Sequence, residues 1–372
     1  VLAFVNQNGI TGTYTNSTGT LGLSGSASLA NYQAALRSVS YQNTSNNPST
    51  LQRAVEFKVN DGQASGSAYF SFVNVTATND PPALSGSGGT LTFAEKDPAT
   101  AVDAAIAVSD PDNVNLASAT ASITANFAPA EDSLVFANQN GITGSFNTNN
   151  GVLTLSGTTN VASYQTALRS VRYLNSSFNP STATRTVSFI VNDGALNSAA
   201  VTRNITVISV NDPPVVTFTS PANGLTVDAP TTISISATAT DVDGTVTQVE
   251  FLEGTNSLGV FTGPYSVTMN NVNAGVYVIT ARATDNQAAI GIATVTNFVR
   301  GAVSSPRLSG GGSLQFDLTG LSTTKTNVIE VSTDLKVWTV LTNFLPNAGT
   351  MLFTDPASAS QGIRYYRHSV KP

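Results

Sequence analysis

The sequence has no cysteine and a single histidine, His368, among its 372 residues. The absence of cysteine excludes a disulfide framework, a thiolate zinc site and a cysteine nucleophile. One histidine leaves almost nothing for a catalytic triad, a histidine-rich metal site or a histidine general base. No apolar run of about 18 residues occurs, so no segment is predicted to span a membrane as a helix. We therefore expect a protein that is not an enzyme.

Charged side chains are also scarce, at 10% of residues, and the net charge at pH 7 is −6. This acidic balance argues against nucleic acid and against anionic membrane surfaces as partners. Apolar residues make up 41%, which is enough to build hydrophobic cores. The surface must then be covered by Ser, Thr and Asn, which favour strands and turns over helices. The composition indicates an all-β protein whose acidic turns suit a divalent cation.

An internal repeat organises the first half of the chain. Residues 2–82 return as residues 134–214 at a constant offset of 132, with about half of the positions identical. Both copies end in the sequence NDPP. One complete repeat therefore spans residues 83–214, and the first copy lacks the counterpart of residues 83–132.

Each repeat alternates short strands with Gly, Asn and Asp turns, the pattern typical of β-sandwiches. In the segment LANYQAALRSV, by contrast, Leu29, Tyr32 and Leu36 recur at helical spacing, which predicts one or two helical turns. Ser28, or Asn160 in the second copy, is the predicted N-cap.

Two further modules follow the repeats. A third set of alternating strands ends at a Gly-rich segment, after which a small all-β module begins. Trp338, the only tryptophan, is predicted to anchor the core of that last module. The predicted domains are an N-terminally incomplete repeat at 1–80, a complete repeat at 81–212, a third sandwich at 213–302 and a small C-terminal β-domain at 303–372.

Three stretches resemble known families. The motifs NQNGITG, YQTALRSVRY, TVSFIVNDG and NDPP resemble the cadherin-like tandem repeats of bacterial surface proteins. The motifs ATDVDG, VEFLEG and ITARATDN look like a bacterial immunoglobulin-like (Ig-like) domain, which recurs in adhesins and in secreted polysaccharide-degrading enzymes. The tail is similar to C-terminal β-domains of secreted bacterial proteins. These resemblances imply tandem Ig-like and cadherin-like β-sandwiches arranged end to end as a rod, outside the cell or on its surface, without assigning a reaction.

Aspartate recurs at corresponding turns of these modules. The complete repeat and the third module each carry an early Asp-x-Asp, a late Asp turn and an Asn-Asp linker in front of them. In a sandwich whose strands run end to end, these acids share the pole that faces the preceding linker. The two predicted groups are Asp80, Asp110, Asp112 and Asp193, and Asp212, Asp241, Asp243 and Asp285. Acids that converge without a cation would repel one another, and calcium takes about six to eight oxygen ligands.

The cadherin-like resemblance implies that these acids hold calcium between domains, so Ca²⁺ is the expected cofactor. Glu95 matches the early glutamate that such repeats contribute at their far pole, which would place it with the second group. The linker Asn-Asp-Pro-Pro is shorter than the Asp-x-Asn-Asp-Asn of the family, which would lower the number of ions. Turn chemistry alone is the alternative, because Asp, Asn and Gly are favoured turn residues.

The sequence thus predicts an extracellular stalk or filament-forming adhesive protein of a bacterial surface, with cell-surface glycan or protein as a partner. The alternative is a non-catalytic glycan-binding accessory region of a secreted polysaccharide-degrading enzyme. Such a region should expose several planar aromatics on one face. Paired carboxylates can serve glycoside hydrolysis, but each pair here belongs to a repeating turn, which favours a structural role.

The incomplete first repeat leaves two explanations open. Its apolar residues Leu2, Phe4, Val55, Phe57 and Val59 are expected to face an open groove, because strands that pack on them in the full repeat have no counterpart. Either the chain is the C-terminal fragment of a longer repeat array, or another copy of the protein adds strands at this groove. The second route would build head-to-tail filaments.

Overall fold

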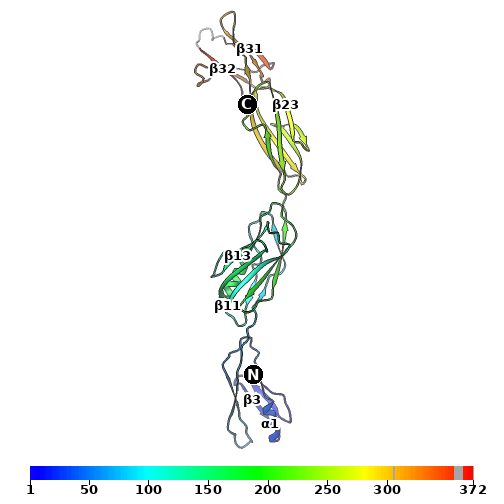
Figure 1. Cartoon of the computed structure of the whole chain (residues 1–372), viewed down its shortest axis with the longest axis vertical. Helices are drawn as coiled ribbons and strands as arrows, with labels where there is room; N and C mark the ends of the chain where they lie inside the picture. The colour runs from blue at the N-terminus through cyan, green and yellow to red at the C-terminus, as the bar shows by residue number, and fades with distance from the viewer. Residues whose placement is uncertain (305, 356–362, 372) are drawn as a thin grey trace. The chain divides into compact units, whose positions relative to one another are not determined.

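The computed structural model describes residues 1–304, 306–355 and 363–371. The chain divides into two compact units, residues 1–208 and 209–372. Figure 1 follows them from blue in the first unit to red at the C-terminus. The described residues are mostly strands, with two nine-residue helices, α1 (Leu29–Arg37) and α2 (Val161–Arg169). The predicted all-β fold of tandem β-sandwiches is confirmed.

The first repeat is built from short strands around α1. Its strands are β1 (Leu2–Ala3), β2 (Thr11–Thr15), β3 (Thr20–Ser24), β4 (Ser40–Tyr41), β5 (Arg53–Phe57) and β6 (Tyr69–Val73). β2 pairs with β3, and β5 pairs with β6, each as a separate antiparallel sheet. Within this repeat only Ile10 and Ala35 are buried apolar residues, and Val59 is 50% exposed.

The complete repeat adds strands that the first repeat lacks. Its strands are β7 (Ala83–Ser85), β8 (Thr90–Ala94), β9 (Thr100–Ala101), β10 (Ala107–Ser109), β11 (Asn115–Ala125), β12 (Asp132–Val135), β13 (Thr143–Asn147), β14 (Val152–Asn160), β15 (Arg172–Asn175), β16 (Arg185–Asn192) and β17 (Val201–Ile208). Six of them form one sheet in the order β13-β14-β11-β16-β17-β8, in which Figure 1 labels β11 and β13. β12, β15 and β9 form a second sheet.

Strand β11 explains why the two repeats differ in burial. It lies between β14 and β16, and Ala121 pairs with Leu153 on one side and Phe189 on the other. Leu153 and Phe189 are both fully buried. In the first repeat their counterparts, Leu21 on β3 and Phe57 on β5, are only partly buried. Among the described residues no strand lies between β3 and β5 and pairs with both, as β11 does in the complete repeat.

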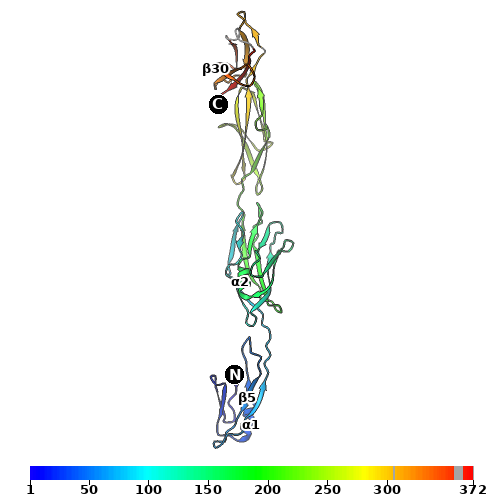
Figure 2. The ribbon, with the colours of Figure 1, turned by 90° about the vertical axis from the view of Figure 1, so that its left-hand side faces the viewer.

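Both helices begin as the sequence predicts. Ser28 caps α1 by accepting a hydrogen bond from the backbone N–H of Asn31, and Asn160 caps α2 by accepting one from Ser163. α2, labelled in Figure 2, buries Tyr164 and Leu168. These side chains accept hydrogen bonds from backbone N–H groups in the first turn that would otherwise have no partner.

A fully buried arginine joins the strands of the complete repeat. Arg185 on β16 places its Nε 3.0 Å from Asp132 Oδ2 and its Nη2 3.3 Å from Glu131 Oε2. Tyr173 donates its hydroxyl to Asp132 Oδ1 at 2.5 Å, and burial raises the pKa of this tyrosine. The corresponding arginine of the first repeat, Arg53, is only partly buried.

The second unit opens with a two-sheet sandwich. Its strands are β18 (Val215–Ser220), β19 (Thr226–Asp228), β20 (Thr231–Thr240), β21 (Val246–Glu253), β22 (Asn256–Phe261), β23 (Ser266–Val272), β24 (Gly275–Asp285) and β25 (Ile290–Arg300). One sheet has the order β18-β20-β23 and the other β19-β25-β24-β21-β22. Between them lies a core that includes Ile235, Phe251 and Ile279.

The C-terminal β-domain packs its own small core. Its strands are β26 (Ala302–Val303), β27 (Arg307–Leu308), β28 (Leu314–Thr319), β29 (Asn327–Ser332), β30 (Thr339–Phe344), β31 (Thr350–Asp355) and β32 (Tyr365–Val370). Phe316, Leu318, Leu321 and Ile329 form this core. The predicted role of Trp338 as its anchor is wrong. Trp338 is half-buried and stacks over the guanidinium of Arg367, whose carbon lies 4.5 Å from the ring centroid.

Candidate functional site

The aspartates that the sequence groups together meet in two clusters, one in each unit. The first cluster comprises Asn79, Asp80, Asp110, Asp112 and Asp193, and the second comprises Asn211, Asp212, Asp241, Asp243 and Asp285. In each case the Asp-x-Asp lies just before a long inner strand, β11 or β21. The late Asp lies at or just after the end of a neighbouring strand, β16 or β24. Strand pairing therefore carries these loops to one end of the sandwich, where the linker passes.

Linker residues tie the first cluster together. Asp110 Oδ1 accepts hydrogen bonds from the backbone N–H groups of Asp112, at 3.1 Å, and Asn113, at 2.7 Å. The N–H of Asp80 donates to Asp112 Oδ2 at 3.1 Å. The side-chain amide of Asn79 donates to Asp193 Oδ2 at 2.8 Å. All three carboxylates that accept these bonds are thus held by the linker or by their own turn.

The second cluster repeats this bonding with different neighbours. Asp241 Oδ1 accepts from the N–H groups of Asp243, at 3.1 Å, and Gly244, at 2.8 Å. The N–H of Asp212 donates to both oxygens of Asp243, at 3.1 and 3.3 Å. The amide of Asn211 donates to Asp285 Oδ2 at 2.8 Å. The same arrangement therefore stands on two modules whose sequences differ.

The late aspartate of each cluster is held in its charged form. Burial opposes the ionisation of Asp193, but hydrogen bonds from the Leu196 N–H, the Asn79 amide and the Ala195 N–H keep its pKa below the usual value. Burial likewise opposes ionisation of Asp285, which is 3% exposed, and hydrogen bonds from the Asn211 amide and from backbone N–H groups outweigh it. Hydrogen bonds that favour the charged form outweigh the desolvation cost in both cases.

Several oxygens of the clusters are buried and make no hydrogen bond among the described residues. They are Asp110 Oδ2 and Asp112 Oδ1 in the first cluster, and Asp241 Oδ2 and Asn211 Oδ1 in the second. A buried polar atom without a partner is costly, and each such atom calls for an explanation such as an ion or a water molecule. Carboxylate and amide oxygens are the ligands that calcium prefers. The donor set therefore fits a calcium ion.

Acidic side chains alone do not complete a site. In the part of the chain that the structure describes, no group of three or more acidic or histidine side chains is placed to hold a metal ion. A cation in either cluster would therefore draw on amide or backbone oxygens in addition to carboxylates. Asn79 and Asn211, which lie in the linkers, are candidate amide ligands because each bonds a cluster aspartate.

Glu95 lies apart from the residues of the second cluster in the sequence and belongs to the first unit. It directly follows β8, its side chain is fully buried, and its Oε1 lies 3.5 Å from Lys96 Nζ. Its backbone N–H donates to the carbonyl of Ile208 at 2.8 Å. Its expected membership in the second cluster stays a prediction.

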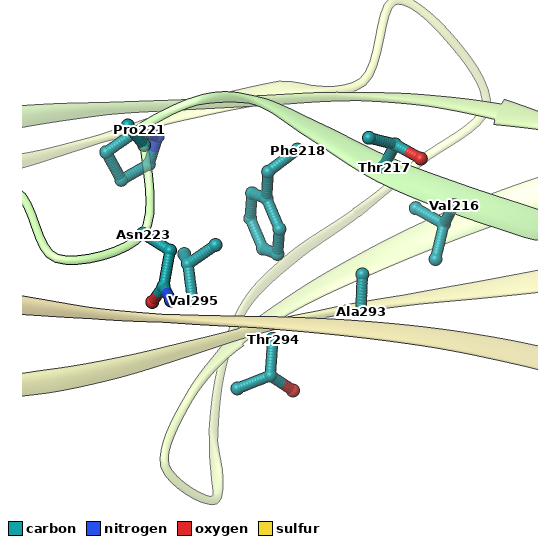
Figure 3. Close-up of a pocket in the computed structure, with 9 residues that line it drawn as sticks. Val216, Thr217, Phe218, Pro221, Asn223, Ala293, Thr294 and Val295 are labelled. Carbon is teal, nitrogen blue, oxygen red and sulfur yellow. The ribbon is translucent and has the colours of Figure 1, made fainter.

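A shallow groove in the second unit offers no reactive chemistry. It has a volume of about 320 Å³ and lies between β18 and β25. Phe218 points into it from β18, opposite Ala293 and Val295, while Thr294 points away (Figure 3). Its lining contains no acid, base or histidine. Among the described residues, no helix is long and apolar enough to cross a membrane.

One signal in the cluster was missed by sequence reasoning. Asn113 donates its side-chain amide to Asn79 Oδ1 at 2.6 Å, so it belongs to the first cluster although it follows the Asp-x-Asp pair. At the corresponding place the second cluster has Gly244. The difference is visible in the sequence, as DPDN against DVDG, but its meaning depends on where the linker amide lies.

In comparisons with known proteins, one family model matches part of the chain. Residues 214–281 match the bacterial Ig domain family. Comparison with well-characterised protein sequences finds none that matches. Structures of the fibronectin(III)-like modules of CbhA from Clostridium thermocellum are 28% identical, over 23% of this chain and 94% of theirs, with a TM-score of 0.22.

Two further structures align with most of the chain at low identity. The human desmocollin-1 ectodomain is 10% identical, over 86% of this chain and 64% of its own, with a TM-score of 0.27. The protocadherin gammaB7 EC3-6 cis-dimer structure is 13% identical, over 90% and 80%, with a TM-score of 0.29. These TM-scores are all below 0.5, so the superpositions assign no function. The chain is a tandem array of β-sandwich domains, and its residues 214–281 are similar to the bacterial Ig domain family.

Proposed function

We propose that the protein is an extracellular, non-enzymatic stalk of a bacterial surface, adhesive in role, whose domain junctions are stiffened by calcium at the two aspartate clusters. The observation that carries the proposal is the repetition of one bonding pattern at two linkers. In both, a linker Asn and a linker Asp bond to the late Asp and to the Asp-x-Asp loop of the following module. Hydrogen bonds within each turn are enough to stabilise the turn itself, so the additional bonds from the linker indicate a role at the junction.

The electrostatics of the clusters support a cation. Each cluster brings partly buried carboxylates, such as those of Asp110 and Asp112 or of Asp241 and Asp243, to loops that the linker contacts, and like charges repel more strongly where water is partly excluded. Asp193 and Asp285 are held ionised by their hydrogen bonds, so they do not relieve the repulsion by taking up protons at neutral pH. A bound calcium ion would supply the compensating charge. The chain's own part is to hold the linker against the two loops through Asn79 and Asp80, or Asn211 and Asp212.

Calcium should stabilise the protein in proportion to its occupancy. Binding only the folded state at 100 times the dissociation constant stabilises by about 2.7 kcal/mol. Asp193→Ala should therefore lower the melting temperature strongly in calcium and only slightly in EDTA. An equal loss in both conditions would contradict the proposal and favour turn chemistry alone.

The first repeat offers a matched control for this experiment. Asp61, the counterpart of Asp193, accepts N–H bonds from Gln63 at 2.9 Å and Ala64 at 2.8 Å, as Asp193 does from Ala195 and Leu196 at 2.7 Å. No linker residue is bonded to Asp61 among the described residues. Asp61→Ala should therefore cost the same small amount with and without calcium.

Chelation should also change the shape of the protein in solution. Without a cation, repulsion among the clustered carboxylates would loosen the junctions. Small-angle scattering of the full chain in calcium and in EDTA should then give different maximum dimensions. Identical profiles would count against the role of calcium at the junctions.

The alternative, a glycan-binding accessory module, has one observation in its favour. Trp338 is half-buried at the surface over Arg367, and Tyr365, 38% exposed, lies two residues from Arg367 on the same face of β32. Planar aromatics beside polar groups are able to stack on sugar rings. A polysaccharide pull-down of the full chain and of Trp338→Ala separates the two roles. Binding that depends on Trp338 would favour the accessory role.

A further inference from the structure

Two phenylalanines stand on an open sheet face of the first repeat. In the pairing of β6 with β5, which is labelled in Figure 2, Phe70 lies opposite Glu56. Phe72 lies opposite Ala54. Paired residues share one face of a sheet, so both phenylalanines are on the face that carries Glu56. Phe70 is 50% exposed and Phe72 is 60% exposed. Large apolar side chains gathered on one exposed face mark an interaction surface.

This face is not the open groove of the incomplete repeat. The groove side of β5 carries the alternate, partly buried residues such as Phe57. In the complete repeat, Thr202 and Asn204 stand at the positions of Phe70 and Phe72. Both are exposed there, although the strands that the first repeat lacks are all in place. A strand laid in the groove, as β11 is in the complete repeat, would therefore leave the two phenylalanines exposed.

Two opposite charges border the phenylalanines. Lys58 follows Glu56 at the two-residue spacing that an extended chain gives to one face, so both belong to the face of Phe70. Both side chains are exposed, and neither forms an ion pair among the described residues. Their counterparts in the complete repeat, Ser188 and Ile190, carry no charge. The aromatic pair and the two charges are thus peculiar to the first repeat.

The face is complementary to a second copy of itself. In a twofold contact each copy presents the same patch, so every pairing across it occurs twice. When two such faces pack with their β5 strands antiparallel, Glu56 of each copy meets Lys58 of the other, and the phenylalanines cover one another. Parallel strands would instead bring like charges together, which is unfavourable. An uncharged sugar would cover the phenylalanines but leave both charges without partners, so a second copy fits the face better.

We infer that this face, formed by Ala54, Glu56, Lys58, Phe70 and Phe72, is a contact between two copies of the chain. The inference goes beyond the proposed stalk and does not involve the aspartate clusters. Five side chains are far fewer than the roughly 20–30 residues that each partner gives to a stable interface, so one contact alone is expected to be weak. On a surface that bears many copies, many such contacts would act together.

Sedimentation velocity of the full chain in EDTA, over a range of protein concentrations, tests the inference without any part for calcium. The unaltered protein should pass from monomer to dimer as its concentration rises. Phe70→Thr combined with Phe72→Asn copies the residues of the complete repeat, so this variant should fold, and its dissociation constant should rise by about tenfold or more. Tyr69→Thr is the matched control. Tyr69 is 71% exposed on the same strand but pairs with Phe57 on the groove side, so this variant should dimerise like the unaltered protein.

Charge reversal tests whether the partner is a second copy. Glu56→Lys alone and Lys58→Glu alone should each weaken self-association by about tenfold or more, because two attractive pairs become two repulsive ones. An equimolar mixture of these two variants should associate again, because each supplies the charge that the other has lost. The chain that carries both substitutions should self-associate like the unaltered protein.

The inference is overturned if the unaltered protein stays monomeric at every concentration. It is also overturned if the phenylalanine double variant dimerises as before, which would place the contact elsewhere, for example at the open edges of β3 and β5. If the mixed charge variants fail to associate, the two charges do not face each other across copies and the twofold contact is wrong. Polysaccharide binding by the monomer that depends on Phe70 and Phe72 would make the face a sugar site instead. None of these results bears on calcium at the aspartate clusters, which is tested by melting in calcium and in EDTA.

Discussion

Lowering the pH from 7.5 to 5.5 should destabilise the C-terminal β-domain, because His368 is buried in a place that cannot accept a charge. His368 is 5% exposed, and its Nε2 lies 2.9 Å from Asn327 Oδ1. Asn327 Oδ1 also accepts the Ser322 N–H, so it acts as an acceptor and Nε2 carries the proton. Nδ1 has no hydrogen-bond partner among the described residues, and the backbone at Gly301 closes over it so tightly that a Cβ there would overlap the ring. A proton on Nδ1 would place a positive charge where nothing solvates it.

The size of the effect follows from the shift in pKa. Burial lowers the pKa of His368 from 6.5 to about 4. Because the pKa is lower in the folded state, the full stability is present above pH 6.5 and is lost as the pH falls towards 4. At about 1.36 kcal/mol per unit, a difference of ~2.5 units amounts to about 3.4 kcal/mol once both states are protonated. Between pH 7.5 and 5.5 the loss is about 1.4 kcal/mol, because the unfolded imidazole takes up most of a proton and the folded one does not.

Trp338 makes the domain observable within the full chain. It is the only tryptophan, and it stacks on Arg367, the residue next to His368. Thermal melts followed by its fluorescence should show the melting temperature falling by about 3–6 °C over this pH range, for the compact unit of residues 209–372 that contains His368. His368→Gln keeps an amide donor and does not titrate, so its melting temperature should stay nearly constant. Since His368 is the only histidine, an equal fall in the variant would refute the reasoning.

The remaining predictions concern the sandwiches. Asn297 is fully buried, and neither its amide nitrogen nor its oxygen has a hydrogen-bond partner among the described residues. Asn297→Val should therefore raise the free energy of unfolding of the third module by about 1–2 kcal/mol, as measured by urea unfolding. A lower free energy of unfolding in the variant would contradict this and would mean that water bonds the amide. Arg185→Met leaves the buried Asp132 without its ion pair and should cost about 3–5 kcal/mol, whereas Arg53→Met at the corresponding, only partly buried position should cost less than about 1 kcal/mol; thermal melts giving equal losses would contradict this. A free peptide of residues 113–127 should bind the first repeat between β3 and β5, as measured by fluorescence anisotropy, and its Ala121→Lys version should not; equal binding of both peptides would argue against strand addition.

The fold was readable from the sequence because its signals are local or repeated. The offset of 132 residues revealed the modules, and the helical spacing after Ser28 and Asn160 located both helices with their caps. Trp338 was placed wrongly because size and apolarity alone favour a core position. The deciding contact comes from Arg367, 29 residues away in the sequence, on strand β32. This strand lies on the other side of β29 from β30, which Trp338 directly precedes, and Arg367 offers its guanidinium to the ring.

The site was readable in part. Carboxylates at equivalent turns are predicted to lie close together, because the strands that carry them return to one end of a sandwich. The amide of Asn113 could not be assigned a role from sequence, because its partner, Asn79, lies 34 residues away and an amide offers a donor and an acceptor with equal ease. Only the position of the linker shows that Asn113 donates and that Asn79 Oδ1 is thereby occupied.

Comparison of the three late aspartates separates turn chemistry from linker recognition. Asp61, Asp193 and Asp285 all accept backbone N–H bonds on Oδ1 from the residues that follow them, which is the ordinary behaviour of aspartate in a turn. These bonds account for Oδ1 and would exist in any such loop. Oδ2 behaves differently, because in Asp193 and Asp285 it accepts the side-chain amide of a linker asparagine, at 2.8 Å in both. Turn chemistry therefore accounts for one oxygen of each carboxylate, and in Asp193 and Asp285 the other oxygen is bonded to the linker, which ordinary turn chemistry does not require.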